Sequence, residues 1–354
     1  MKNLLSVYIV LILILSVSSC DKDEPKDPEI PFQQTPYNLQ IPAGFPQMEI
    51  PADNPLTEEG VRLGRRLFYD KMLSKDLTQS CASCHNQQLA FSDNGNQFST
   101  GVDGQTGTRN AQALINLGFN RHFFWDGRSP TLEIQAVEPV PNPIEMHLSW
   151  REAALRLNAN SEYKQLFKEA FNTSSIDSTH VTKALSQFMR TMISSNSKLD
   201  KRLRNESALS PSEINGYVIF NTEKGDCFHC HNIDGGRLLT DNQFHNNGLD
   251  ATFTDLGRGA VTGNPADYGK FLTPTLRNVA LTAPYMHDGR FQTLEQVIEH
   301  YNSGGIPSPT IDPLMKHVGT GLGLTAQEKA DLLAFLNTLT DSTFINDERL
   351  SNPF

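Results

Sequence analysis

The sequence lacks several features that would point to common classes of protein. Its 354 residues contain no long run of lysine or arginine, and the formal net charge is −10, which argues against nucleic acid as a partner. The apolar run from Leu4 to Val17 is shorter than the roughly 20 residues that a membrane-spanning helix needs. No segment alternates apolar and polar residues as a half-buried strand would. Only five cysteines are present.

Four of these cysteines form two copies of one motif, Cys81-Ala-Ser-Cys84-His85 and Cys227-Phe-His-Cys230-His231. The spacing C-x-x-C-H is typical of c-type haem attachment: two thiols bind the porphyrin and the histidine binds the iron. A zinc site or a disulfide also uses C-x-x-C, but a histidine directly after both copies favours haem. The sequence therefore predicts two covalently bound c-type haems.

The fifth cysteine, Cys20, ends the N-terminal apolar segment. A positive start, an apolar run and small residues before the cut predict an export signal over residues 1–19. The sequence Val17-Ser18-Ser19-Cys20 resembles a bacterial lipoprotein cleavage site, with Cys20 as the acylated residue. An ordinary signal peptide cut nearby and an uncleaved anchor are the alternatives. We expect an exported lipoprotein on the periplasmic side, held at the membrane by its lipid.

The rest of the chain has a proline-rich start followed by regular helix signals. Residues 20–50 combine six prolines with mixed charges, which predicts an extended tether. Capping residues then predict several helices, and a further helix is expected from 180 to about 203. The capped segments follow Thr57 (58–69), Ser149 (to about 157), Ser210-Pro211 (into 220), Thr293 and Thr325.

Each C-x-x-C-H motif follows one of the predicted helices, and the motifs start 146 residues apart (227 minus 81). This arrangement predicts a duplicated unit that carries one haem in each copy. We expect an N-terminal domain over residues 51–207, a C-terminal domain over 208–345 and a tail over 346–354.

Four further motifs make the sequence resemble the bacterial di-haem cytochrome c peroxidase family, including its MauG-like branch. The likeness covers roughly residues 55–339. It implies a mainly α fold with two cytochrome c-like haem domains and long loops. In that family the C-terminal haem collects electrons and the N-terminal haem reduces hydrogen peroxide. The motifs are Thr108-Arg109-Asn110, Phe123-Phe124-Trp125-Asp126-Gly127-Arg128, Asn142-Pro143-Ile144-Glu145-Met146 and Leu281-Thr282-Ala283-Pro284-Tyr285-Met286-His287-Asp288-Gly289.

The resemblance assigns roles to three residues near the first haem. Glu145 occupies the position of the glutamate that moves a proton between the peroxide oxygens. Gln135 matches a glutamine of the same pocket, and Trp125 matches a tryptophan that lies between the haems. Without the family, Glu145 would be read as a surface carboxylate and Trp125 as a core aromatic residue.

The resemblance also implies a calcium ion between the two domains. Asn110 would bind it through its side chain, and Thr282 and Pro284 through their backbone carbonyl groups. Oxygen ligands completed by water suit Ca²⁺.

Two positions depart from the usual family pattern. Val102 stands where a histidine caps the peroxide-reducing iron, and residues 86–110 contain no His, Met, Lys, Cys or Tyr. We therefore expect an open distal face at the first iron. Tyr301 stands where many family members use methionine as the distal ligand of the second iron. Met286, Met315 or another histidine is the alternative ligand.

The sequence thus predicts an enzyme that reduces hydrogen peroxide with electrons from a small carrier, a cytochrome c or a cupredoxin. A MauG-like oxidase, which uses peroxide to oxidise residues of a partner protein, is the second hypothesis. A non-catalytic electron-transfer cytochrome is the third. Because family members often form homodimers, a homodimer is a further expectation.

Overall fold

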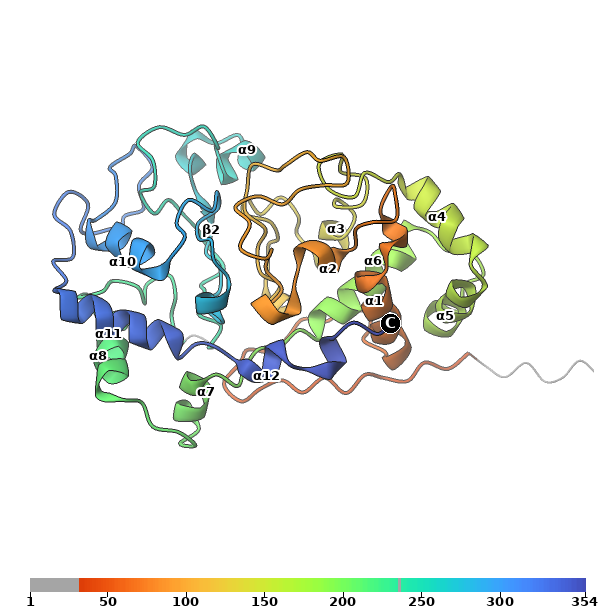
Figure 1. Ribbon diagram of the computed structural model, residues 1–354, viewed down its shortest axis with the longest axis horizontal. Coiled ribbons are helices and arrows are strands. Elements are labelled where there is room, and N and C mark those ends of the chain that lie inside the picture. The colour runs from red at the N-terminus through yellow and green to blue at the C-terminus, as the bar shows by residue number, and fades with distance from the viewer. Residues whose placement is uncertain (1–31, 235–236) are drawn as a thin grey trace, which may run out of the picture. The chain divides into compact units, whose positions relative to one another are not determined.

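Two pairs of crossing helices organise the chain (Figure 1). In this computed structural model, which describes residues 32–234 and 237–354, α1 (Glu58–Tyr69) packs on α6 (Ser178–Arg190), and α8 (Pro211–Phe220) packs on α11 (Ala326–Asn337). Both crossings depend on a glycine, because a Cβ at Gly64 would overlap the backbone of α6 and one at Gly216 the backbone of α11.

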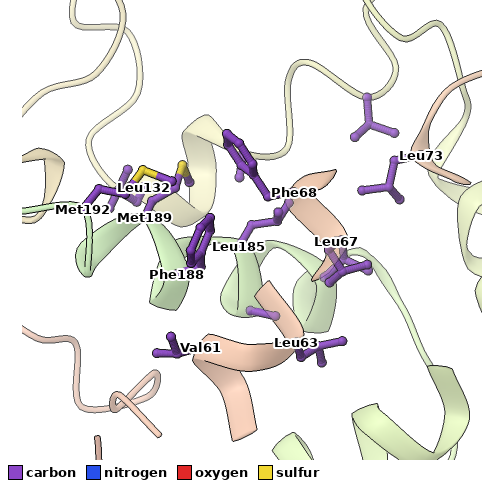
Figure 2. Close-up of a cluster of buried hydrophobic side chains, with 14 of the residues drawn as sticks. Val61, Leu63, Leu67, Phe68, Leu73, Leu132, Leu185, Phe188, Met189 and Met192 are labelled. Atoms are coloured by element: carbon purple, nitrogen blue, oxygen red, sulfur yellow. The ribbon is translucent and has the colours of Figure 1, made fainter. Parts of the chain in front are cut away.

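A separate hydrophobic core surrounds each helix pair. In the first, Leu63, Leu67 and Phe68 of α1 lie beside Leu185 and Phe188 of α6 (Figure 2). The second core is built mainly by α8, α11 and α10 (Leu294–Asn302). The predicted mainly α fold is confirmed. The remaining helices are α2 (Cys81–Cys84), α3 (Leu132–Gln135), α4 (Trp150–Ala159), α5 (Ser161–Phe171), α7 (Lys198–Leu203), α9 (Arg258–Thr262) and α12 (Ser342–Ile345).

The described residues include one small sheet, in which β1 (Phe244–His245) pairs antiparallel with β2 (Phe271–Leu272). Phe244 lies opposite Leu272. None of the described helices has both the length and the apolar character that crossing a membrane requires.

The two halves repeat one local plan. Each contains an asparagine in the left-handed region that starts a 3₁₀ turn, then an antiparallel bridge, then a helix capped by threonine. These features are Asn116, Phe123 with Ser129, and Thr131 before α3 in the first half, and Asn278, Tyr285 with Phe291, and Thr293 before α10 in the second. The repeat supports the duplicated unit that the sequence predicts.

The prediction of one helix over 180–203 is wrong, because the structure has two helices there, α6 and α7, with a non-helical segment between them. There the backbone N–H groups of Ser195 and Asn196 donate to the carboxylate of Asp341 instead of to helix carbonyls. Ser197 then caps α7. Leu199 of α7 is buried in the second core, so that core begins before the boundary predicted at 207.

The ends of the chain also differ from expectation. Residues 34–50 of the predicted tether pack on the folded body: the Tyr37 N–H donates to the Leu56 carbonyl, and Met48 is buried against Phe119. Apolar side chains between the prolines explain this packing. Leu350 of the predicted tail is buried in the first core. The predicted signal peptide, Cys20 and the start of the tether lie outside the described residues.

Candidate haem-binding and active site

One cavity of about 670 Å³ is lined by both C-x-x-C-H motifs. Around the first motif its walls include Glu145 and Gln135, and around the second they include Tyr301. Trp125 lines it as well. The two motifs, Glu145, Gln135 and Trp125 therefore all line the same cavity.

The first motif forms α2, which Ser80 and Ser83 cap by reciprocal hydrogen bonds. His85 follows directly, and its Nδ1 lies 2.9 Å from the carbonyl oxygen of Phe91. Burial lowers the pKa of His85, so the ring is neutral at pH 7 and Nδ1 donates its proton to that carbonyl. This hydrogen bond fixes the tautomer and leaves Nε2 as a free ligand atom.

The second motif repeats this arrangement. Nδ1 of His231 lies 3.0 Å from the carbonyl oxygen of Leu239, and burial lowers the pKa of His231. Cys81, Cys84, Cys227 and Cys230 are all free thiols that line the cavity. Each motif therefore presents two unpaired sulfur atoms and one oriented imidazole.

Glu145 is held in the wall of the first-motif region. The side-chain amide of Asn142 donates to its Oε1 at 2.6 Å, and the N–H of Val102 donates to its backbone carbonyl at 2.9 Å. Burial raises the pKa of Glu145 above its usual value. A carboxyl group with a raised pKa is suited to take and return a proton near neutral pH.

The loop that carries Val102 is a tight turn, closed by a bridge between Thr100 and Thr106. Ser99, Thr100 and Gly101 line the cavity, and none of them has a side chain that usually binds iron. Outside the cavity, Asp103 bonds to Lys75 at 2.8 Å and to His147 at 2.5 Å. The loop is therefore pinned at its outer end.

Tyr301 lies on α10, on the helix face that buries Leu294 and Ile298. The side-chain amide of Asn247 donates to the Tyr301 hydroxyl at 3.1 Å and lies 3.5 Å from Sδ of Met286. Burial raises the pKa of Tyr301 to about 12. Two of the residues predicted as possible distal ligands, Tyr301 and Met286, are therefore both close to the side-chain amide of Asn247.

The repeat explains why only the second half carries such a side chain. In the repeat, Phe124 corresponds to Met286, which is 162 residues later (286 minus 124). By the same offset, Pro139 corresponds to Tyr301. In the first half the helix ends at Gln135, because prolines follow at 139, 141 and 143. The chain then turns along the cavity and places Glu145 in its wall.

Trp125 joins the two halves. Its indole N–H donates to the Asn110 carbonyl at 2.8 Å, and its own carbonyl accepts from the N–H of Leu272 at 2.8 Å. Beside it, Arg109 binds Asp126 and Asp255. The bond from Leu272 ties the segment around Trp125 to β2.

Comparisons with known proteins agree with this geometry. The family described as di-haem cytochrome c peroxidase matches residues 58–208. Methylamine utilization protein MauG of Methylorubrum extorquens is 39% identical over 82% of this chain and 80% of its own. Cytochrome c551 peroxidase of Nitrosomonas europaea is 34% identical over 84% and 85%. The chain belongs to the di-haem cytochrome c peroxidase family.

A crystal structure supports the assignment. It shows a MauG-like protein associated with microbial copper homeostasis, is 39% identical, covers 90% of this chain and 99% of its own, and has a TM-score of 0.83. As a member of this family, the protein is an oxidoreductase of the peroxidase class, and two c-type haems are its implied cofactors. The two unpaired thiols and single free imidazole nitrogen at each motif fit one haem each.

The three residues predicted for calcium, Asn110, Thr282 and Pro284, all line the cavity of this di-haem peroxidase. The Asn110 amide nitrogen donates to the Gln97 carbonyl, and Gln97 in turn lies beside Gly289 and Pro284. Among the described residues, no hydrogen bond is found to Oδ1 of Asn110 or to the carbonyls of Thr282 and Pro284. Three available oxygen acceptors fit a hard cation.

Sequence reasoning missed three partners of the site. Asn142 and Asn247 orient Glu145 and Tyr301. His245 lines the cavity between Asp241 at 2.8 Å and Asp312 at 2.6 Å. Burial alone would lower its pKa, but Asp241, Cys230 and Asp312 together raise the pKa of His245 to about 11. Asn142 is 3 residues from Glu145 and His245 is 4 from Asp241, so these two pairs could have been found, whereas Asn247 is 54 residues from Tyr301.

Proposed function

We propose that this protein reduces hydrogen peroxide to water beside the first motif, with electrons from a small redox carrier that enter at the second. The observation that carries the proposal is Glu145, a half-buried carboxyl group with a raised pKa in a region where the nearby loop supplies no iron ligand. A carrier that only transfers electrons has no use for such a group.

The chemistry divides between the haem and the chain. Haem supplies an iron that binds peroxide and passes electrons. Reduction breaks the O–O bond, takes up two electrons and two protons, and releases two molecules of water. Glu145 accepts a proton from one peroxide oxygen and returns it to the other, which becomes the leaving water. Asn142 holds the carboxyl group in place, and Gln135 lies in the same wall to orient the substrate.

The two motifs have different tasks in this proposal. Trp125 lies in the cavity wall that both share and provides an aromatic ring for electron transfer between them. Tyr301 is proposed as the distal ligand of the second iron, because it is the cavity-lining phenol that Asn247 orients. In this proposal His85 would be the only protein ligand of the first iron, and peroxide would bind without a preceding half-reduction. A fully low-spin first haem in the electron paramagnetic resonance spectrum of the oxidised protein would contradict this.

A second function has specific support. Tyr301 and the absence of a ligand residue in the loop of Val102 both favour a MauG-like oxidation of residues in a partner protein. Relatives named MauG and relatives named peroxidase match over similar shares of the chain.

One experiment separates these functions and a pure carrier. Peroxide is added to the fully oxidised holoprotein with and without a reduced small cytochrome c or cupredoxin. Steady oxidation of the carrier supports the peroxidase. A long-lived oxidised spectrum with slow turnover supports the MauG-like oxidase. No response to peroxide in any redox state refutes both.

The remaining expectations extend the proposal. We propose that the protein acts on the periplasmic side and that Cys20 carries a lipid anchor, because the N-terminal sequence resembles an export signal with a lipoprotein cleavage site. A calcium ion at Asn110, Thr282 and Pro284 would tie the two halves together. Labelling with a radioactive fatty acid tests the anchor, and metal analysis after chelation tests the ion.

A further inference from the structure

A segment of the second half reaches back to the first. Leu339 is buried in the second core, whereas Phe344 and Leu350 are buried in the first, each with 3% of its surface exposed. Figure 1 shows this segment running from α11 through α12 toward α1. We call residues 341–351 the C-terminal strap.

The strap is anchored at both ends. At its start, the buried carboxylate of Asp341 accepts hydrogen bonds from the N–H groups of Ser195 and Asn196, both at 2.9 Å. At its end, Tyr69 of α1 donates to the Leu350 carbonyl at 2.7 Å, and Arg65 donates to the Ser351 carbonyl at 2.6 Å. Its path across the first core is therefore fixed.

Between these anchors the strap covers the turn that follows the first motif. The Gln87 amide donates to the Asp347 carbonyl at 2.9 Å, and the Gln88 amide donates to the Ile345 carbonyl at 2.8 Å. The rings of Phe344 and Phe91 meet edge to face, with centroids 5.6 Å apart. Phe91 is also the residue whose carbonyl accepts the hydrogen bond of His85.

That turn needs support from outside. Ala90 and Phe91 have φ values of 52° and 60°, in the left-handed region that residues with a side chain seldom adopt. The second motif has a comparable turn, and each turn is held in part by its own half: the Leu114 N–H donates to the Phe91 carbonyl at 3.4 Å, and the Leu276 N–H donates to the Leu239 carbonyl at 3.3 Å. At the first motif the strap adds a contact to Phe91 from the other half.

We infer that the C-terminal strap positions the proximal ligand of the first iron, with Phe344 holding Phe91 so that its carbonyl stays on Nδ1 of His85. The inference rests on the proposed haem site. A hydrogen bond at Nδ1 makes the imidazole a stronger donor to the metal. Loosening it weakens the iron–histidine bond and favours the reduced iron, so the first haem's reduction potential rises.

The test compares Phe344→Ala, Phe344→Leu and the exposed control Phe354→Ala in the holoprotein. Resonance Raman spectroscopy follows the iron–histidine stretch of the reduced protein, and spectroelectrochemistry gives the potential of each haem. We expect Phe344→Ala to lower the stretching frequency and raise the potential of the first haem alone. Phe344→Leu should restore most of both, and Phe354→Ala should change neither.

An unchanged first haem in Phe344→Ala, or equal shifts at both haems, overturns the inference. If the Phe344→Ala protein is not produced in folded form, Gln87→Ala provides a second test, because it removes the hydrogen bond to the Asp347 carbonyl of the strap. Its stretching frequency and first-haem potential must then shift in the same directions, by smaller amounts. Neither readout depends on turnover. A protein that does not reduce peroxide but shows these shifts would refute the proposed function and leave the strap intact.

Discussion

Replacing Glu145 by Gln tests the proposed chemistry most directly. Glutamine has the same shape, and its side-chain oxygen still accepts the hydrogen bond of Asn142 that is 2.6 Å long in the native protein. Only proton transfer is lost. General acid–base groups contribute about 10²- to 10⁴-fold, so we expect kcat/KM for peroxide to fall by that factor. This corresponds to about 3–5 kcal/mol of transition-state stabilisation.

The same substitution should stabilise the fold. Because burial raises the pKa of Glu145, the folded protein binds this proton more tightly than the unfolded chain. Between the unfolded and the folded pKa, the free energy of unfolding therefore falls as pH rises. Glu145→Gln removes that cost. Its Tm should exceed that of the native protein at pH 8, and the difference should shrink at pH 4.

The assay is the initial rate of oxidation of a reduced carrier by peroxide in a stopped-flow instrument, with thermal unfolding measured on the same samples. Glu152→Gln is the matched control, because its side chain is 54% exposed on α4 and pairs only with Arg156. A value of kcat/KM for Glu145→Gln within about threefold of the native value would refute the role of this carboxyl group.

Three other substitutions have defined outcomes. Asp200→Asn breaks a bidentate pair with Arg277 in which both side chains are at most 3% exposed, so urea unfolding should show a loss of about 3–5 kcal/mol. Asp312→Asn removes one of the partners, besides Asp241 and Cys230, that raise the pKa of His245 above its ordinary value of 6.5. The loss of Tm should therefore be full below pH 6.5 and fade as pH rises through the folded-state pKa of His245; equal losses at pH 6 and pH 10 would contradict this. Tyr301→Phe should change the absorption and paramagnetic spectra of the second haem only.

Local signals explain what the sequence predicted of the fold. The starts of α1, α8, α10 and α11 were predicted because their caps are adjacent residues: Thr57, Ser210, Thr293 and Thr325. The start of α5 was missed because Asn160 is both the C-cap of α4 and the N-cap of α5. No loop signal separates them.

Distant partners explain what the sequence could not predict. The break between α6 and α7 depends on Asp341, which is 145 residues from Asn196. In the site, the attachment residues follow from chemistry that is local in sequence. The orientation of Tyr301 depends on Asn247, 54 residues away, and no periodicity or spacing indicates that pair.

The contrast between α3 and α10 has a consequence for how an enzyme can arise from a doubled scaffold. Both helices begin after an equivalent threonine, but one has four residues and the other nine. In the proposed function, the shorter helix leaves room for a small oxidant while the surrounding framework keeps its shape. The change in sequence that this requires is small, because prolines at 139, 141 and 143 are enough to prevent the shorter helix from continuing.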